Sequence, residues 1–276
     1  MKSFITRVIT ALIAITAVVV LYYYTGSVGL KALGWLTVVL GGQELARILF
    51  PTAELNPLKI IFYVILVSLF ALSFTWPKWS ELFFSFSMIS FVIVSLSFFK
   101  HFDIYKLTHI NAKACLGFFY LGLLPGFGLQ ILEIKNGTAW FSAFLIVVFS
   151  GDIGAYLAGS LFGKDKIFPH ISPKKSYQGA LGGLMFALIA ATFCQRFILH
   201  GTALGPWLVL AGFTTIIAQF GDFFESLLKR VAHIKDSGTV MPGHGGVLDR
   251  LDGVLFASPV MLFGIQCIHL LTISKY

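Results

Sequence analysis

Charged residues are scarce in this sequence. Asp, Glu, Lys and Arg make up 12% of its 276 residues, about half of the share typical of a soluble domain. A soluble protein of this size would need a charged surface, so the composition argues against one. The three cysteines, Cys115, Cys194 and Cys267, each lie inside an apolar run, and no CxxC spacing is present. They are predicted to be small buried hydrophobic residues and not metal ligands.

Long apolar runs stand where the charge is missing. Hydrophobic residues make up 57% of the chain, and a run of about 18 or more can cross a bilayer as a helix. The predicted fold class is therefore all-α, a polytopic integral membrane helical bundle with about nine transmembrane helices. The expected spans are residues 5–24, 30–50, 58–76, 82–99, 112–132, 139–162, 178–199, 203–229 and 253–273.

Two of these runs depart from a plain membrane span. The run 5–24 is long for a signal peptide and ends at Tyr24, a poor cleavage site, so it is interpreted as a retained helix. The run 30–50 is predicted either to re-enter the membrane or to lie buried in the bundle. The reason is that it carries three polar residues, Gln43, Glu44 and Arg47.

The sequence contains no internal repeat and no low-complexity linker. Residues 1–276 are therefore predicted to form a single membrane domain, with N-terminal spans in 1–110 and catalytic spans in 111–276. Within the fifth expected span, Pro125 and the glycines around it are expected to kink or break the helix.

The distribution of basic residues predicts the orientation. With the N-terminus in the cytoplasm, fifteen of the 20 Lys and Arg residues fall on the cytoplasmic side, and the other side holds Lys31, Lys78, Lys135, Arg196 and Lys275. This bias supports a cytoplasmic N-terminus. The net charge of +8 is then explained by orientation and by anionic lipid headgroups, and no nucleic-acid partner is expected.

A first polar region follows the sixth expected span. Asp152 lies inside an apolar run, where an ionisable side chain is costly and so indicates a function. Ser172-Pro173-Lys174-Lys175 forms a compact basic turn. Such a turn is either an anchor on the positive side of the membrane or a clamp for phosphate.

A second polar region begins in the eighth expected span. On a helix, Asp222, Glu225, Ser226 and Lys229 would share one face, since they are spaced at i, i+3, i+4 and i+7. These residues could form intrahelical ion pairs, with Asp222 or Glu225 bonded to Lys229. Beside a membrane, however, charges that face a cavity are the favoured interpretation.

A glycine-rich loop completes this region just before the last span. Asp249 and Asp252 lie three residues apart after Gly245-Gly246, and carboxylates on such a loop are suitable ligands for Mg²⁺. The nearby Lys and Arg side chains suit the phosphates that Mg²⁺ bridges. Spacing alone therefore predicts Mg²⁺-assisted phosphate chemistry without naming the substrate.

Residues 226–252, the signature segment, closely resemble the signature of phosphatidate cytidylyltransferases, also called CDP-diacylglycerol synthases. The matching positions are Ser226, Lys229, Arg230, Lys235, Asp236, Gly238, Pro242, His244, Gly245, Gly246, Asp249, Arg250 and Asp252. Met241 stands where the family usually has Leu, Ile or Phe. In the preceding motif, Ser176, Tyr177 and Gln178 replace a more usual Thr, Trp and Glu, which leaves the role of Gln178 open.

The resemblance implies transfer of the cytidylyl group of CTP to phosphatidate, giving CDP-diacylglycerol and pyrophosphate. It implies metal binding by Asp222 and Asp249, with Mg²⁺ and a monovalent cation such as K⁺. It assigns phosphate binding to Lys229, Arg230, Lys235 and Arg250, and substrate contacts to Ser172, Lys174, Lys175, Ser226 and Asp152. His244 is expected either to contact a phosphate or to brace the loop.

The resemblance also implies partners and a location. A homodimer is expected, in a bacterial plasma membrane, with the active site open to the cytoplasm and to the bilayer that holds phosphatidate. A CTP-dependent lipid-alcohol kinase is the nearest alternative, and it would release CDP instead of pyrophosphate. CDP-alcohol phosphotransferases fit less well because their motif is absent from the sequence. An anion transporter is disfavoured because the charges gather at one side and not through the membrane midplane.

Overall fold

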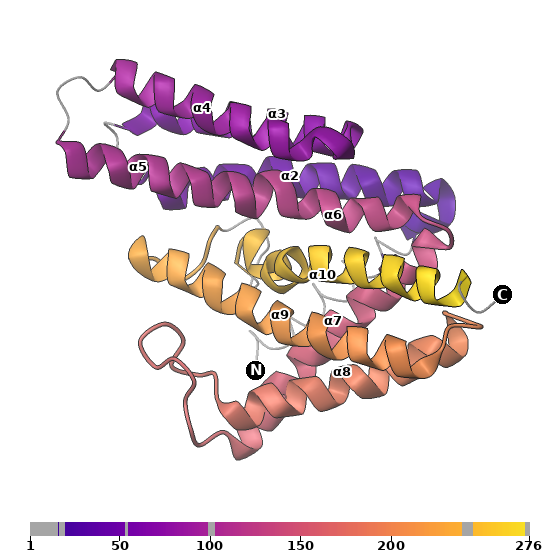
Figure 1. The fold of residues 1–276 in the computed structure, drawn as a ribbon. Coiled ribbons are helices and arrows are strands. Elements are labelled where there is room, and N and C mark those ends of the chain that lie inside the picture. The colour runs from indigo at the N-terminus through magenta and orange to yellow at the C-terminus, as the bar shows by residue number, and fades with distance from the viewer. Residues whose placement is uncertain (1–15, 17–19, 53–54, 99–102, 239–244, 274–276) are drawn as a thin grey trace. The chain divides into compact units, whose positions relative to one another are not determined.

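The computed structural model describes residues 16, 20–52, 55–98, 103–238 and 245–273 (Figure 1). Helices dominate this part of the chain, and no strand occurs within it apart from one isolated bridge between Lys166 and Ser176. The expected all-α class is therefore confirmed. Most of the expected first span, 5–24, lies outside the described residues, as does His244.

The chain divides into two compact units, each described here by itself. The first unit comprises residues 1–129 and 228–251. Its helices are α2 (Ser27–Leu49), α3 (Asn56–Thr75), the short η2 (Pro77–Trp79), α4 (Ser80–Phe98) and α5 (Ile104–Gly117). Their core is aromatic, since the rings of Phe50, Phe62, Phe91 and Phe118 are fully buried and contact one another.

The helix that carries Pro125 is irregular, as expected. A π-helical segment, η3 (Phe118–Leu123), separates α5 from α6 (Leu124–Gln130), in which Pro125 is the second residue. Proline has no N–H to donate, and a wider π-turn just before it is a common way to accommodate that loss. The irregularity is thus a local change of helical pitch within one candidate span, Ile104–Glu133.

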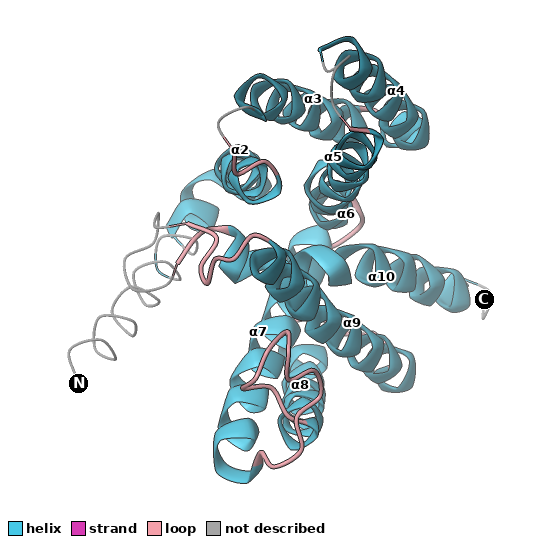
Figure 2. Ribbon diagram, turned by 90° about the vertical axis from the view of Figure 1, so that its left-hand side faces the viewer, coloured by secondary structure: helices cyan, strands magenta, loops and turns pink. Residues whose placement is uncertain are grey.

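The second unit comprises residues 130–227 and 252–276. Its elements are η4 (Ile131–Glu133), α7 (Gly137–Phe162) and α8 (Tyr177–Phe197), with most of α9 (Leu204–Val231) and of α10 (Leu248–Ile273). Figure 2 shows α7 and α8 side by side, joined by a long loop. Glycines allow this close approach, because a Cβ on Gly182 would lie 2.2 Å from that of Ala158.

Seven helices of the described part are long and apolar enough to cross a membrane. They correspond to the expected spans from the third to the ninth, so the chain is an integral membrane protein. Helix α2 coincides with the second expected span but is not among the seven. Glu44 near its C-terminal end is only 2% exposed, in agreement with a polar helix end buried inside its bundle.

Candidate functional site

A pocket of about 610 Å³ opens within the second unit. Its walls come from α7, α8, α9 and the loop 163–176 that Figure 2 shows between α7 and α8. Six of the predicted site residues line it, namely Asp152, Ser172, Lys174, Lys175, Asp222 and Ser226. The pocket thus brings together two regions that lie about 50 residues apart in the chain, and it combines lysines with apolar walls.

Lys175 is held at the side of this pocket by two contacts. Its ammonium group forms an ion pair with Asp222 and lies 4.5 Å from the centre of the Phe223 ring. The Phe223 ring is in turn braced edge-on by Phe168. A cation between a carboxylate and an aromatic face is oriented before any ligand arrives, so Lys175 is preorganised to meet an anion.

The loop that carries Lys174 and Lys175 is fixed by hydrogen bonds at its base. Ser176 accepts a bond of 3.2 Å from the Gly179 N–H and so caps the N-terminus of α8. The Gln178 side chain accepts from the N–H groups of Lys164 and Asp165, and its amide group donates to the Asp165 carboxylate at 2.8 Å. This contact explains why an amide is suitable at position 178, since a glutamate would face Asp165 with a like charge.

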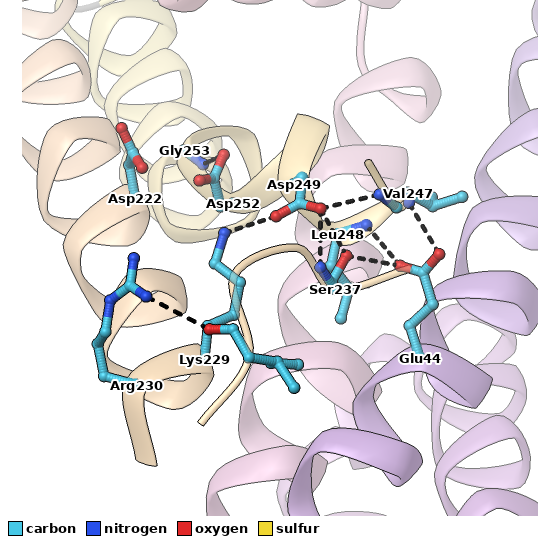
Figure 3. A network of polar contacts seen from close by, with 12 residues as sticks. Glu44, Asp222, Lys229, Arg230, Ser237, Val247, Leu248, Asp249, Asp252 and Gly253 are labelled. Atoms are coloured by element: carbon cyan, nitrogen blue, oxygen red, sulfur yellow. Dashed lines mark hydrogen bonds and ion pairs between the residues drawn. The ribbon is translucent and has the colours of Figure 1, made fainter. Parts of the chain in front are cut away.

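Carboxylates gather on α9 and α10 within the second unit. The side chains of Asp222 and Asp252 lie within hydrogen-bonding reach of each other (Figure 3). Glu225 is close enough to act on Asp252 electrostatically. Two adjacent carboxylates repel each other unless a proton or a cation lies between them. Oxygen donors of this kind therefore fit a hard divalent cation, although no group of three acidic or other typical ligands meets the geometry of a metal site among the described residues.

Asp249 lies in the first unit, and both of its oxygens are engaged (Figure 3). Oδ1 accepts from the Lys229 ammonium group at 2.5 Å. Oδ2 accepts from the Ser237 and Gly246 N–H groups at 2.9 and 2.8 Å and lies 3.0 Å from the Ser237 hydroxyl. The side chains of Lys229 and Asp249 are 11% and 9% exposed, so this pair is largely withdrawn from water.

The remaining basic residues of the signature segment are exposed. Arg230 donates to the Ile234 carbonyl at 3.4 Å, and Lys235 and Arg250 lie at the surface. Exposed cations are accessible to a soluble anionic ligand, although water and salt screen their charge. His244 is outside the described residues, and its expected contact stays a prediction.

Glu44 is a residue of this region that motif analysis did not include. Its buried carboxylate accepts hydrogen bonds from Ser237, Val247 and Leu248, three residues of the signature segment. The signal in the sequence was a charge in an apolar run, which indicated burial but not the partner. Nothing in local spacing could connect position 44 with positions 237–248.

The comparisons with known proteins agree with the resemblance in the signature segment. A phosphatidate cytidylyltransferase of Mycobacterium bovis is 37% identical over 151 residues, 54% of this chain and 48% of that protein. The proteins of the same name from Bacillus subtilis and Staphylococcus saprophyticus are 37% and 34% identical, over 52% and 64% of this chain and 54% and 65% of their own lengths. The aligned part of this chain thus spans between about half and two thirds of these relatives. The model of the cytidylyltransferase family matches residues 5–268, and the chain therefore belongs to that family.

Proposed function

We propose that this protein transfers the cytidylyl group of CTP to phosphatidate and releases pyrophosphate. A phosphate oxygen of phosphatidate attacks the α-phosphorus of CTP, and the bond from that phosphorus to the oxygen of the β-phosphate breaks. The electron pair leaves with pyrophosphate, and CDP-diacylglycerol is formed. The observation that carries the proposal is the pocket in which Lys175 of the basic turn forms an ion pair with Asp222. The relatives of the chain bear this activity in their name.

The lysines of the pocket serve to bind and orient phosphate. Lys175 is already oriented by Asp222 and Phe223, and Lys174 and Ser172 lie on the same turn. The attacking group is an anion, so no residue has to remove a proton from it. Positioning and neutralisation of charge are therefore the main contributions of the protein.

A divalent cation fits the carboxylates of the site. Asp222 would hold Mg²⁺ together with Asp252 in the second unit, and Asp249 is a further ligand by resemblance to the family. When bound, Mg²⁺ neutralises charge on the triphosphate and on the departing pyrophosphate. A monovalent cation such as K⁺ beside it belongs to the same proposal.

The surroundings of the site follow from the two substrates. Phosphatidate stays in the bilayer and CTP is soluble, so the site belongs at the membrane surface. We assign it to the cytoplasmic face of a bacterial plasma membrane, in a homodimer with a cytoplasmic N-terminus and about nine spans per chain. The bias of Lys and Arg toward one side supports this orientation.

The test is an assay of the purified full chain in detergent with phosphatidate, CTP labelled in the cytidine, and Mg²⁺. The expected result is lipid-extractable label with equimolar pyrophosphate, lost on chelation of Mg²⁺. Asp222→Ala should lower the rate by about 100-fold or more, as expected for loss of a residue that would hold the cation that neutralises transition-state charge. Asp103→Ala, which removes an exposed carboxylate at the start of α5, is the matched control and should leave the rate unchanged.

Other outcomes separate this proposal from its alternative. Release of CDP with a phosphorylated lipid would identify a CTP-dependent kinase instead. Absence of any labelled product from folded protein supplied with Mg²⁺ would reject both enzymes. Full activity in Asp222→Ala would keep the reaction but remove Asp222 from the metal site.

A further inference from the structure

We propose that Glu44 of α2 is a positioning residue for the signature segment, and that it acts on Asp249 through Ser237. The inference rests on the proposed function, because it assigns the segment's geometry to catalysis. Glu44 lies 193 residues before Ser237 and outside every motif found in the sequence. All the residues involved belong to the first unit.

The Glu44 carboxylate joins two separate parts of the signature segment (Figure 3). Oε1 accepts from the Val247 N–H at 3.0 Å, and Oε2 accepts from the Leu248 N–H at 3.1 Å. Oε2 also lies 2.9 Å from the Ser237 hydroxyl. Ser237 and the adjoining Val247 and Leu248, on either side of residues 239–244, are therefore held by one side chain from a distant helix.

Two of these bonds cap a helix. Helix α10 begins at Leu248, and the first N–H groups of a helix have no partner within it. The Glu44 carboxylate satisfies the first of them, on Leu248, together with the N–H of Val247 just before the helix. It also places negative charge at the positive end of the helix dipole. Because Asp249 is the next residue of α10, the cap also fixes the direction from which the Asp249 side chain leaves the helix.

Ser237 connects Glu44 with Asp249. Its hydroxyl lies 2.9 Å from Glu44 Oε2 and its N–H donates to Asp249 Oδ2 at 2.9 Å. One donor is thus available for each carboxylate. The other oxygen of Asp249, Oδ1, forms the ion pair with Lys229. If Ser237 were displaced, Asp249 would lose the donors that orient it toward Lys229.

Glycines leave room for Glu44 at two signature positions. A Cβ on Gly238 would lie 2.3 Å from Glu44 Oε1, and a Cβ on Gly246 would lie 2.4 Å from Oε2. Contacts under about 3 Å force a displacement, here of a fully buried carboxylate. Glycine at 238 is therefore explained by a residue outside the signature, and glycine at 246 by Glu44 together with the Ser237 hydroxyl, which would lie 2.1 Å from the added Cβ.

Only glutamate meets all three donors without rearrangement. In glutamine, an NH₂ group replaces one of the two oxygens. This donor would face another donor, either the Val247 N–H or the Leu248 N–H and Ser237 hydroxyl. Aspartate is shorter by one methylene group and falls short of the same donors. Glu44→Gln thus keeps the volume of the side chain and removes one acceptor, which makes it the informative variant.

The experiment compares the intact protein with Glu44→Gln, Ser237→Ala, the double variant and Gln43→Ala. Gln43 is exposed on the same helix and is the matched control. Glu44→Gln is expected to lower kcat by about 10–100-fold, as is typical for residues that orient a ligand of a site, with KM for CTP changed less than about threefold. The double variant should be no worse than the poorer single variant, because both substitutions break the same link.

A second readout does not depend on activity. Hydrogen exchange of the Val247 and Leu248 amides should become at least about tenfold faster in Glu44→Gln and stay unchanged in Gln43→Ala. Unchanged exchange together with full kcat would overturn the inference. If the losses of kcat in the two single variants add up in the double variant, Glu44 does not act through Ser237. If the loss of kcat follows a fall in Tm, the role of Glu44 is structural only. Faster exchange in a protein that makes no CDP-lipid would instead reject the proposed function and retain the positioning of the loop.

Discussion

Among single residues, Gln178 controls the geometry of the basic turn through its contact with Asp165. Its amide group donates to the Asp165 carboxylate while its oxygen accepts two backbone N–H groups. The loop that bears Lys174 and Lys175 is thereby tied to the first turn of α8. Both side chains are accessible to solvent, so the strength of the contact depends on an amide donor facing a carboxylate acceptor.

Gln178→Glu should weaken this tie, because it places a second carboxylate beside Asp165. We expect KM for CTP to rise by about three- to tenfold, with a smaller change in kcat, in steady-state assays at constant ionic strength. The double variant Gln178→Glu with Asp165→Asn restores a donor opposite the new carboxylate and should recover most of the affinity. Equal KM values in the single variant and the intact protein would contradict this role.

Single residues differ in how far their surroundings could be predicted from sequence. Helical spacing predicted that four polar residues of α9 share one face, and two of the four, Asp222 and Ser226, line the pocket. The bond between Lys229 and Asp249 joins positions 20 residues apart on two different helices, where helical periodicity does not apply. The Glu44 contacts span about 200 residues, and a single sequence carries no signal for such a pair.

At the level of elements, the packing of α7 on α8 depends on small residues. A Cβ on Gly154 would lie 2.5 Å from that of Phe186, and one on Gly182 would overlap Ala158. Close backbone approach is the main source of helix association in a bilayer, where lipid and protein are equally apolar. The base of the pocket, which both helices line, therefore depends on this packing.

Gly182→Ala should destabilise the folded protein by about 1–3 kcal/mol, the range for an overpacked core. Gly212→Ala in α9 is the control, because its Cβ would meet only the Leu184 and Leu188 side chains at 3.8 and 3.9 Å. That substitution should be neutral or slightly stabilising, since alanine favours a helix over glycine. Thermal unfolding in detergent measures both, and a Gly182→Ala protein as stable as the control would refute the packing argument.

Hydropathy predicted where the helices begin and end better than it predicted their irregular or buried parts. The third to ninth expected spans coincide with helices that begin and end within a few residues of the predicted limits, except that the fifth begins earlier, at Ile104. Hydropathy is effective here because an unpaired backbone in a bilayer is so costly that an apolar run must become a helix. The sequence indicated an irregularity near Pro125 but not its π-helical form. For α2 it left two alternatives open, of which burial in the bundle agrees with the 2% exposure of Glu44.

For the whole molecule, the orientation in the membrane is the property still to be measured. The positive-inside bias predicts that the loop 163–176 faces the cytoplasm and that the turn at Lys135 faces the other side. His170 and Lys135 are exposed positions in these two segments. A single cysteine can be placed at either one after the three natural cysteines are replaced by alanine.

A membrane-impermeant maleimide applied to intact spheroplasts should label Lys135→Cys at once. It should label His170→Cys only after the membrane is permeabilised. Both variants should react in detergent, which controls for access. Labelling of His170→Cys in intact spheroplasts would invert the orientation and place the pocket on the side away from CTP.

The bonds of Glu44 also determine how the polypeptide can be divided. A fragment that starts at residue 111 contains every residue of the signature but leaves the amides of Val247 and Leu248 without their carboxylate. The early spans are consequently more than a membrane anchor that another anchor could replace. Chimeras between relatives should exchange α2 and the signature segment together, as one inherited block.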